Sequence, residues 1–187
     1  MAFIETPSNP EFCDQNRAAA GHIPNFVTTF AARPAVYEAW KQLNGAIKQS
    51  MDLRRYELAT LAAASALKSS YCCLAHGQVL ADKFYTAEEV ESLVGGPAND
   101  PVDRAVMDFA RKVALSADAV TQQDVDDLKA LGLTDADVLD VVLAAAARAF
   151  FSKTLDATGT QPDSAFNGLL PESLRKNLTV GRAIHSG

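Results

Sequence analysis

The chain lacks the features that would tie it to a membrane or to nucleic acid. Its apolar runs fall far short of the roughly 18 residues that a membrane-spanning helix needs. The N-terminus has no basic region followed by an apolar one, so no secretory signal is expected. With 17 Lys and Arg against 23 Asp and Glu, the net charge is −6, and no basic stripe could neutralise phosphates. We therefore expect no membrane partner and no nucleic-acid partner.

Cysteine is also scarce. Cys13 stands alone, and Cys72 and Cys73 are adjacent, so the count of three is odd. This pattern does not suit a disulfide framework and favours a reducing, cytoplasmic location. No Cys-x-x-Cys or His-x-x-x-His pair supports a zinc site, so neither a metal nor a cofactor is expected.

Strand-like alternation of apolar and polar residues is missing, and helix signals take its place. Alanine recurs in runs such as 62–64 and 144–147, and alanine is the best helix former. Asp52 and Asp100 suit helix N-caps, Thr121 and Thr134 open predicted helices, and Thr86 begins a capping box. The expected helices are a short one near 11–20, then 34–49, 53–68, 70–84, 86–95, 102–118, 121–128 and 134–155. The sequence predicts an all-α protein of about seven or eight helices.

The chain divides into three parts by composition. Residues 1–33 are rich in Pro, Asn and Gly and read as an N-terminal arm. Residues 34–158 carry the helical pattern and form the predicted domain. Residues 159–187 are broken by Pro and Gly and are predicted to be a C-terminal tail.

Candidate chemistry lies in the stretch 69–76. Cys72 and His76 are four residues apart in a predicted helix, so they share one face. An imidazole beside a thiol lowers the pKa of the thiol, and the positive end of the helix near Ser70 favours the thiolate further. Glu57 falls inside an Ala/Leu-rich helix, where a buried acid would need a partner.

The spacing of these residues resembles a known signature. A Glu, a Cys-x-x-Cys beginning twelve residues later, and a His four residues after the second Cys mark the alkylhydroperoxidase D / carboxymuconolactone decarboxylase superfamily. Glu57, Cys72 and His76 match it, whereas Ser69 replaces the first Cys. Pro24-Asn25 together with 30–34 looks like the start of its peroxidase-related branch, and 108–113 and 140–151 resemble later helices, so the resemblance covers about 21–163.

The resemblance implies a multi-helix bundle of the alkylhydroperoxidase D type and thiol-based antioxidant chemistry. In dithiol members the second Cys attacks a peroxide and the first resolves the product as a disulfide. Carried over, Cys72 would be the nucleophile, His76 the base or relay, and Glu57 the carboxylate behind it. It also implies a homo-oligomer, a dimer, trimer or hexamer, with active sites near subunit contacts, and a small-molecule substrate that is a hydroperoxide or a lactone or oxoacid.

Ser69 closes the family's dithiol cycle, because a hydroxyl cannot form a disulfide. Cys73 does not plainly replace it, since a disulfide between adjacent residues in a helix would be strained. One option is a peroxidase whose oxidised Cys72 is resolved by an external thiol reductant or by another chain, such as a partner's Cys13. The others are a Cys72 redox sensor and a lyase or isomerase in which Glu57 and His76 transfer protons. Tyr71 is expected to line the pocket, and Cys73 to be a packing residue.

Overall fold

The computed structural model describes residues 2–18 and 21–186, and these residues contain helices but no strand. The all-α prediction is therefore confirmed. The first three helices along the chain are α1 (Pro10–Gln15), α2 (Asn25–Phe30) and α3 (Pro34–Ser50). The remaining elements are α4 (Leu53–Ala66), α5 (Ser70–Lys83), α6 (Ala87–Gly95), α7 (Pro101–Ser116), the 3-10 helix η1 (Ala117–Ala119), α8 (Gln122–Ala130), α9 (Asp135–Thr158), α10 (Phe166–Leu169) and α11 (Glu172–Leu178).

The helix starts follow the caps that the sequence contains. Asp52 Oδ1 accepts a hydrogen bond from the Arg55 amide at 3.0 Å, Thr86 forms the predicted capping box, and Thr134 forms one as well. The end of α9 lies three residues beyond the predicted 155, where Gly159 caps it with a φ of 77°. Local side-chain chemistry thus sets most boundaries, and it brings Cys72 to the first turn of α5.

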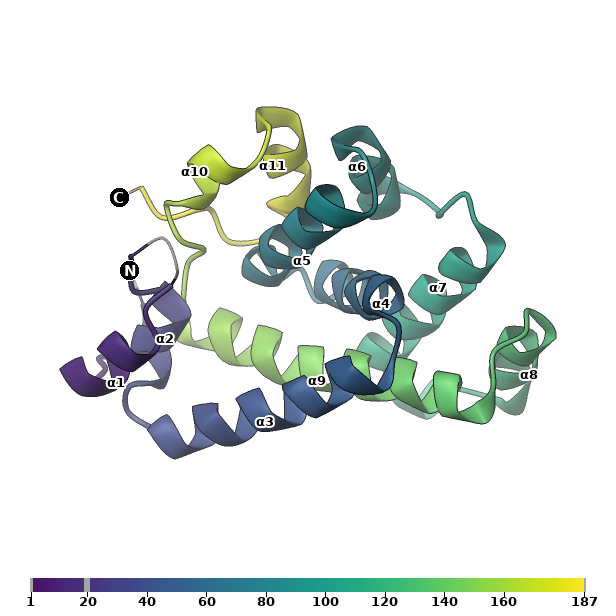
Figure 1. Cartoon of the computed structure of the whole chain (residues 1–187), viewed down its shortest axis with the longest axis horizontal. Helices are drawn as coiled ribbons and strands as arrows, with labels where there is room; N and C mark the ends of the chain where they lie inside the picture. The colour runs from purple at the N-terminus through teal and green to yellow at the C-terminus, as the bar shows by residue number, and fades with distance from the viewer. Residues whose placement is uncertain (1, 19–20, 187) are drawn as a thin grey trace.

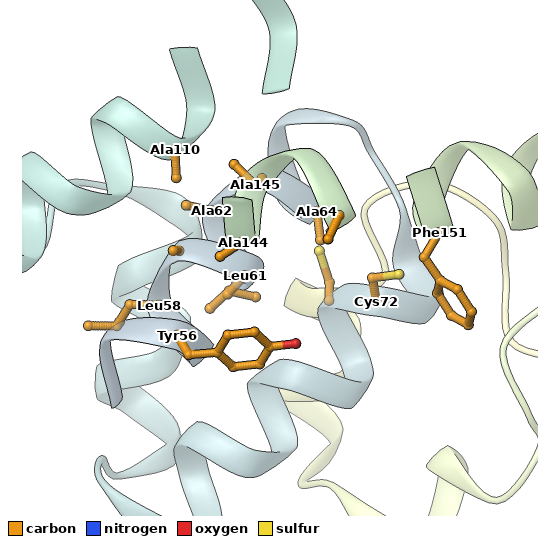
Figure 2. Packing of buried hydrophobic residues seen from close by; sticks show 14 of the residues in the cluster. Tyr56, Leu58, Leu61, Ala62, Ala64, Cys72, Ala110, Ala144, Ala145 and Phe151 are labelled. Atoms are coloured by element: carbon orange, nitrogen blue, oxygen red, sulfur yellow. The ribbon is translucent and has the colours of Figure 1, made fainter. Parts of the chain in front are cut away.

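Helix α4 lies at the centre of the fold and contacts α5, α7 and α9 (Figure 1). The side chains where α4, α7 and α9 meet are small, among them Ala62, Ala110, Ala144 and Ala145 (Figure 2). Because alanine fills little space, the helix backbones come close together here. Glu57, on the same central helix, is therefore sealed from solvent.

The C-terminal segment packs on the helix that carries Cys72. Leu178 of α11 lies where Gly77 of α5 has no side chain, and a Cβ on Gly77 would come within 2.6 Å of it. The Gly181 amide donates to Ser70 Oγ at 2.8 Å, at the start of α5. Residues 159–187, predicted as a tail, thus include helices α10 and α11, and Leu174 and Leu178 are fully buried.

An apolar stripe runs over the outer face of the neighbouring helices α3 and α9. It consists of Val36, Leu43, Leu139, Leu143 and Phe150, each of them exposed. Part of it borders a groove of about 440 Å³ that includes Trp40 and Ala147. The outer face of α9 is therefore open along this single chain. Within the described residues, no helix is long and apolar enough to cross a membrane.

Candidate functional site

The candidate site lies between α3, α4, α5 and α9. Helix α5 places Cys72 and His76 one turn apart, and α4 presents Glu57 opposite them. Cys72 is 1% exposed, whereas the His76 side chain is 13% exposed. The imidazole therefore reaches the surface while the sulfur lies behind it in the core.

Glu57 and His76 form the pair that the sequence predicts. Glu57 Oε2 lies 2.5 Å from His76 Nδ1, and Glu57 Oε1 accepts a hydrogen bond from Lys48 Nζ at 3.0 Å. Burial by itself would raise the pKa of Glu57, but the bonds to His76 and Lys48 lower it below its usual range. Glu57 is therefore an ionised carboxylate held by α3 and α5.

The same surroundings keep His76 neutral. Burial, together with the nearby charge of Arg148, lowers the pKa of His76 to about 4 although Glu57 acts in the opposite direction. A neutral imidazole carries one proton, and the carboxylate of Glu57 requires that proton on Nδ1. Nε2 is then left as a proton acceptor.

The hydrogen bond to Cys72 comes from Arg148. Arg148 Nη1 donates to Cys72 Sγ at 3.5 Å, and Arg148 is only 3% exposed. Burial would lower the pKa of Arg148, but Cys72 and then Tyr56 raise it above its usual value. No hydrogen bond joins Cys72 to His76 among the described residues, so the two groups that share the face of α5 have separate partners.

Tyr56 connects the surroundings of His76 with those of Arg148. Its hydroxyl donates to Asn44 Oδ1 at 2.8 Å, and the same hydroxyl stabilises the Arg148 guanidinium. Its ring meets the His76 ring edge-on, with centroids 6.1 Å apart. Figure 2 shows Tyr56 and Cys72 among the buried residues of the core. Tyr56 thus contacts the His76 ring and faces the Arg148 guanidinium.

The other two cysteines differ from Cys72. Cys73 is fully buried, and burial, with the neighbouring Cys72, raises the pKa of Cys73 well above its usual value. Cys13 lies on α1, away from α5 (Figure 1). All three are free thiols. A buried thiol with a raised pKa is unreactive, which agrees with the packing role expected for Cys73.

Ser69 and Tyr71 flank Cys72 at the N-terminal end of α5. Ser69 is fully buried at the N-cap of α5, and its hydroxyl is a neighbour of the Asp156 carboxyl on α9. The Tyr71 hydroxyl donates to Asp163, and its ring packs edge-on against Phe26. Tyr71 therefore ties α5 to the segment that follows α9, and its role in lining a pocket stays a prediction.

Sequence reasoning did not identify Lys48, Tyr56 or Arg148 as parts of the site. Arg148 had a usable signal, because it is the one charged residue in the apolar run 141–151. Lys48 and Tyr56 had none, since both fit an ordinary helix surface or core position. Among the described residues, no group of three His, Cys, Asp or Glu side chains is placed to hold a metal ion.

Known proteins share the fold of this chain. The sequence model of the carboxymuconolactone decarboxylase family matches residues 34–112. The alkylhydroperoxidase AhpD core structure of an uncharacterized peroxidase-related protein from Ralstonia eutropha JMP134 matches with a TM-score of 0.79 at 23% identity, over 91% of this chain and 98% of that one. A peroxidase-related protein from Silicibacter sp. TM1040 gives a TM-score of 0.76 at 19% identity, over 89% and 94%.

A third similar structure is a cysteine-to-alanine variant of the debrominase Bmp8 in complex with 2,3,4-tribromopyrrole. It matches with a TM-score of 0.73 at 16% identity, over 93% of this chain and all of the other. No curated protein sequence matches the chain. The chain therefore has the alkylhydroperoxidase D-like fold and matches the carboxymuconolactone decarboxylase family model over residues 34–112.

Proposed function

We propose that this protein is a thiol-dependent hydroperoxide reductase in which Cys72 is the nucleophile and His76 and Glu57 relay a proton. The observation that carries the proposal is the 2.5 Å contact between Glu57 Oε2 and His76 Nδ1, one helical turn from Cys72. A carboxylate behind an imidazole fixes its tautomer and raises its basicity, which is the arrangement that proton transfer needs.

In the first step the Cys72 sulfur attacks the terminal oxygen of the hydroperoxide. A sulfur–oxygen bond forms and the oxygen–oxygen bond breaks, so Cys72 is oxidised to a sulfenic acid and the hydroperoxide is reduced to an alcohol. The departing alkoxide needs one proton. His76 can deliver it, because Nε2 of the neutral imidazole takes up a proton from solvent and the Glu57 carboxylate stabilises the imidazolium until that proton passes to the alkoxide.

Return to the thiol requires an external thiol reductant. Ser69 cannot form a disulfide, and the buried Cys73 has a raised pKa that makes it a poor resolving thiol. One external thiol would condense with the sulfenic acid, releasing water and forming a mixed disulfide with Cys72. A second would reduce that disulfide, so two thiols are oxidised for each hydroperoxide.

The test is consumption of an organic hydroperoxide with a small dithiol as reductant. Cys72→Ser is expected to abolish turnover, whereas the matched variants Cys73→Ala and Cys13→Ser should retain it. A sulfenic-acid probe of the dimedone type should label Cys72 and leave Cys73 unlabelled. Turnover that survives Cys72→Ser, or equal labelling of both thiols, would refute the assignment.

A second candidate is a lyase or isomerase that acts on a lactone or oxoacid. It is favoured by the exposure of the site, because His76 reaches solvent and Cys72 does not. In this reaction Glu57 and His76 would move protons, and Cys72 would be dispensable. Turnover of such a substrate by the Cys72→Ser variant would establish it, and loss of that turnover would exclude it.

The similar debrominase suggests one more compound to test as a substrate, 2,3,4-tribromopyrrole. Its consumption only by proteins with an intact Cys72 would move the proposal from peroxide to halogenated substrates while keeping the same nucleophile. If no substrate is consumed and Cys72 is oxidised reversibly, the protein is a redox sensor instead.

A further inference from the structure

Arg148 is a buried cation without a carboxylate partner. It is 3% exposed, and no Asp or Glu among the described residues forms an ion pair with it. Its Nε has no hydrogen-bond partner either. A charge removed from water needs an opposite charge or a full set of hydrogen bonds, because otherwise its burial costs several kcal/mol. Something other than a carboxylate must balance Arg148.

The atom that contacts the guanidinium is the Cys72 sulfur, 3.5 Å from Nη1. A thiol is only a weak acceptor, whereas a thiolate is an anion that can balance the guanidinium. The titratable and charged groups around the sulfur come from four helices. They are Lys48 from α3, Tyr56 and Glu57 from α4, Tyr71, Cys73 and His76 from α5, and Arg148 and Asp156 from α9.

Most of these charges are already matched elsewhere. Glu57 is bound by Lys48 and His76, so it does not balance Arg148. Asp156 lies within reach of Ser69 and of Arg182 Nε, which is 3.8 Å from its Oδ1. The Tyr56 hydroxyl donates a hydrogen bond to Asn44 Oδ1, so its proton is engaged there. Cys72 is the remaining source of negative charge.

We infer that Cys72 is a thiolate in the resting protein, held as a buried ion pair by Arg148. Arg148 touches the reacting sulfur and would thus be a catalytic residue; that part of the inference rests on the proposed function, whereas the ionisation state of Cys72 does not. The pair assigns the two groups on α5 separate tasks. Arg148 keeps the sulfur ionised, and His76 delivers the proton that the departing alkoxide takes up.

The surroundings of Arg148 hold it in this position. The guanidinium carbon lies 5.7 Å from the centre of the Phe151 ring, and the Tyr56 hydroxyl faces the same charge. Tyr56 is itself bonded to Asn44, so side chains of α3 and α4 support the Arg148 guanidinium that contacts the Cys72 sulfur. A guanidinium fixed in this way cannot turn away toward solvent.

The experiment is a pH titration of the thiolate absorbance in the ultraviolet. Subtracting the curve of the Cys72→Ser variant isolates the contribution of Cys72 from those of Cys13 and Cys73. In the parent protein we expect Cys72 to ionise below about pH 7, as cysteines beside Arg do. Arg148→Met, which keeps length and loses the charge, should move this transition to about pH 8.5 or above, and Arg148→Lys should leave it between the two.

A Cys72 that is still protonated near pH 7 in the parent overturns the inference by itself, so the test does not depend on whether the Arg148→Met variant folds. An Arg148→Met titration identical to that of the parent overturns it as well. Hydroperoxide turnover is assayed separately on the same samples. If Cys72 is a thiolate but no hydroperoxide is consumed, the proposed function is wrong and the ion pair stands. If hydroperoxide is consumed but Cys72 is protonated near pH 7, the ion pair is wrong and the proposed function stands.

Discussion

Two series of side chains run from α3 through α4 to α5, and they end one helical turn apart. In the first, Lys48 contacts Glu57, and Glu57 contacts His76. In the second, Asn44 accepts from Tyr56, whose hydroxyl faces Arg148, the residue that donates to Cys72. Their starting points are four residues apart on α3, and their middle residues are adjacent on α4. Helical periodicity therefore builds both from one scaffold.

The difference between the two series is their access to water. The first begins with a Lys48 side chain that is 43% exposed and ends at the partly exposed His76. The second contains Arg148 and Cys72, both almost fully buried. The first series, Lys48–Glu57–His76, is called the open series because it can exchange protons with solvent. The second, Asn44–Tyr56–Arg148–Cys72, is called the closed series, and it keeps a fixed charge next to the sulfur because the local dielectric is low. The fold thus gives the Glu57–His76 pair and the Cys72 sulfur separate surroundings.

The largest expected effect comes from Glu57→Gln in the open series. Gln keeps the shape but loses the negative charge, so it can no longer stabilise the imidazolium of His76. Hydroperoxide or lactone turnover should fall by roughly 10²- to 10⁴-fold, the usual contribution of a positioned acid–base group. Steady-state kinetics measures this loss, and circular dichroism is the folding control. A loss below about tenfold would mean that this pair is structural.

A second test uses acid. The pKa of His76 is about 4 in the folded protein against 6.5 in the unfolded chain, so the unfolded state binds more protons between these values. Stability should therefore be fully present above about pH 6.5 and should decline as the pH falls toward about 4, by up to roughly 3 kcal/mol from this residue. Glu57, whose pKa is also lowered, adds a loss in the same direction at lower pH.

Urea denaturation at a series of pH values measures this loss. His76→Gln is the matched control, because it removes the titrating group while keeping a polar side chain opposite Glu57. Its stability should change less over the same interval. An equal decline in both proteins would show that other groups cause the acid sensitivity.

Glu57, Cys72 and His76 could be predicted from sequence, whereas Lys48 in the open series and Tyr56 and Arg148 in the closed one could not. Glu57, Cys72 and His76 lie within twenty residues on two consecutive helices, so spacing and capping bring them together. Arg148 is 76 residues from Cys72, and its contact depends on how α9 crosses α5. Helix starts at Asp52, Thr86 and Thr134 follow local rules, but the angle between helices follows from side-chain packing across the whole core. The lone charge of Arg148 in an apolar run was a signal of a buried polar group that the sequence analysis did not use, and it could not have named the partner.

The third effect is smaller and belongs to the closed series. Tyr56→Phe removes the hydroxyl that bonds to Asn44 and faces Arg148. Loss of one such hydrogen bond should cost about 1 kcal/mol of folding free energy, and somewhat more if Asn44 cannot find water. The ionisation of Cys72 should also move upward in pH, because Arg148 is held less firmly. Asn44→Ala should reproduce the change in stability without removing the Tyr56 hydroxyl from Arg148, and identical titrations in both variants would argue against a direct role of Tyr56.

The smallest effect is expected for Lys48→Met. Lys48 bonds to Glu57 at 3.0 Å and lies 5.3 Å from the centre of the Tyr56 ring, but nearly half of its side chain is exposed. An ion pair of this kind contributes at most about 1 kcal/mol, and salt weakens it because solvent reaches the ammonium group. Urea denaturation should therefore show a small loss that shrinks as salt is added. Turnover should change only severalfold, since His76 still holds the Glu57 carboxylate. If Lys48→Met were instead as damaging as Glu57→Gln, the ammonium group would have to act on the substrate itself, and the open series would be a charge-binding site as well as a proton relay.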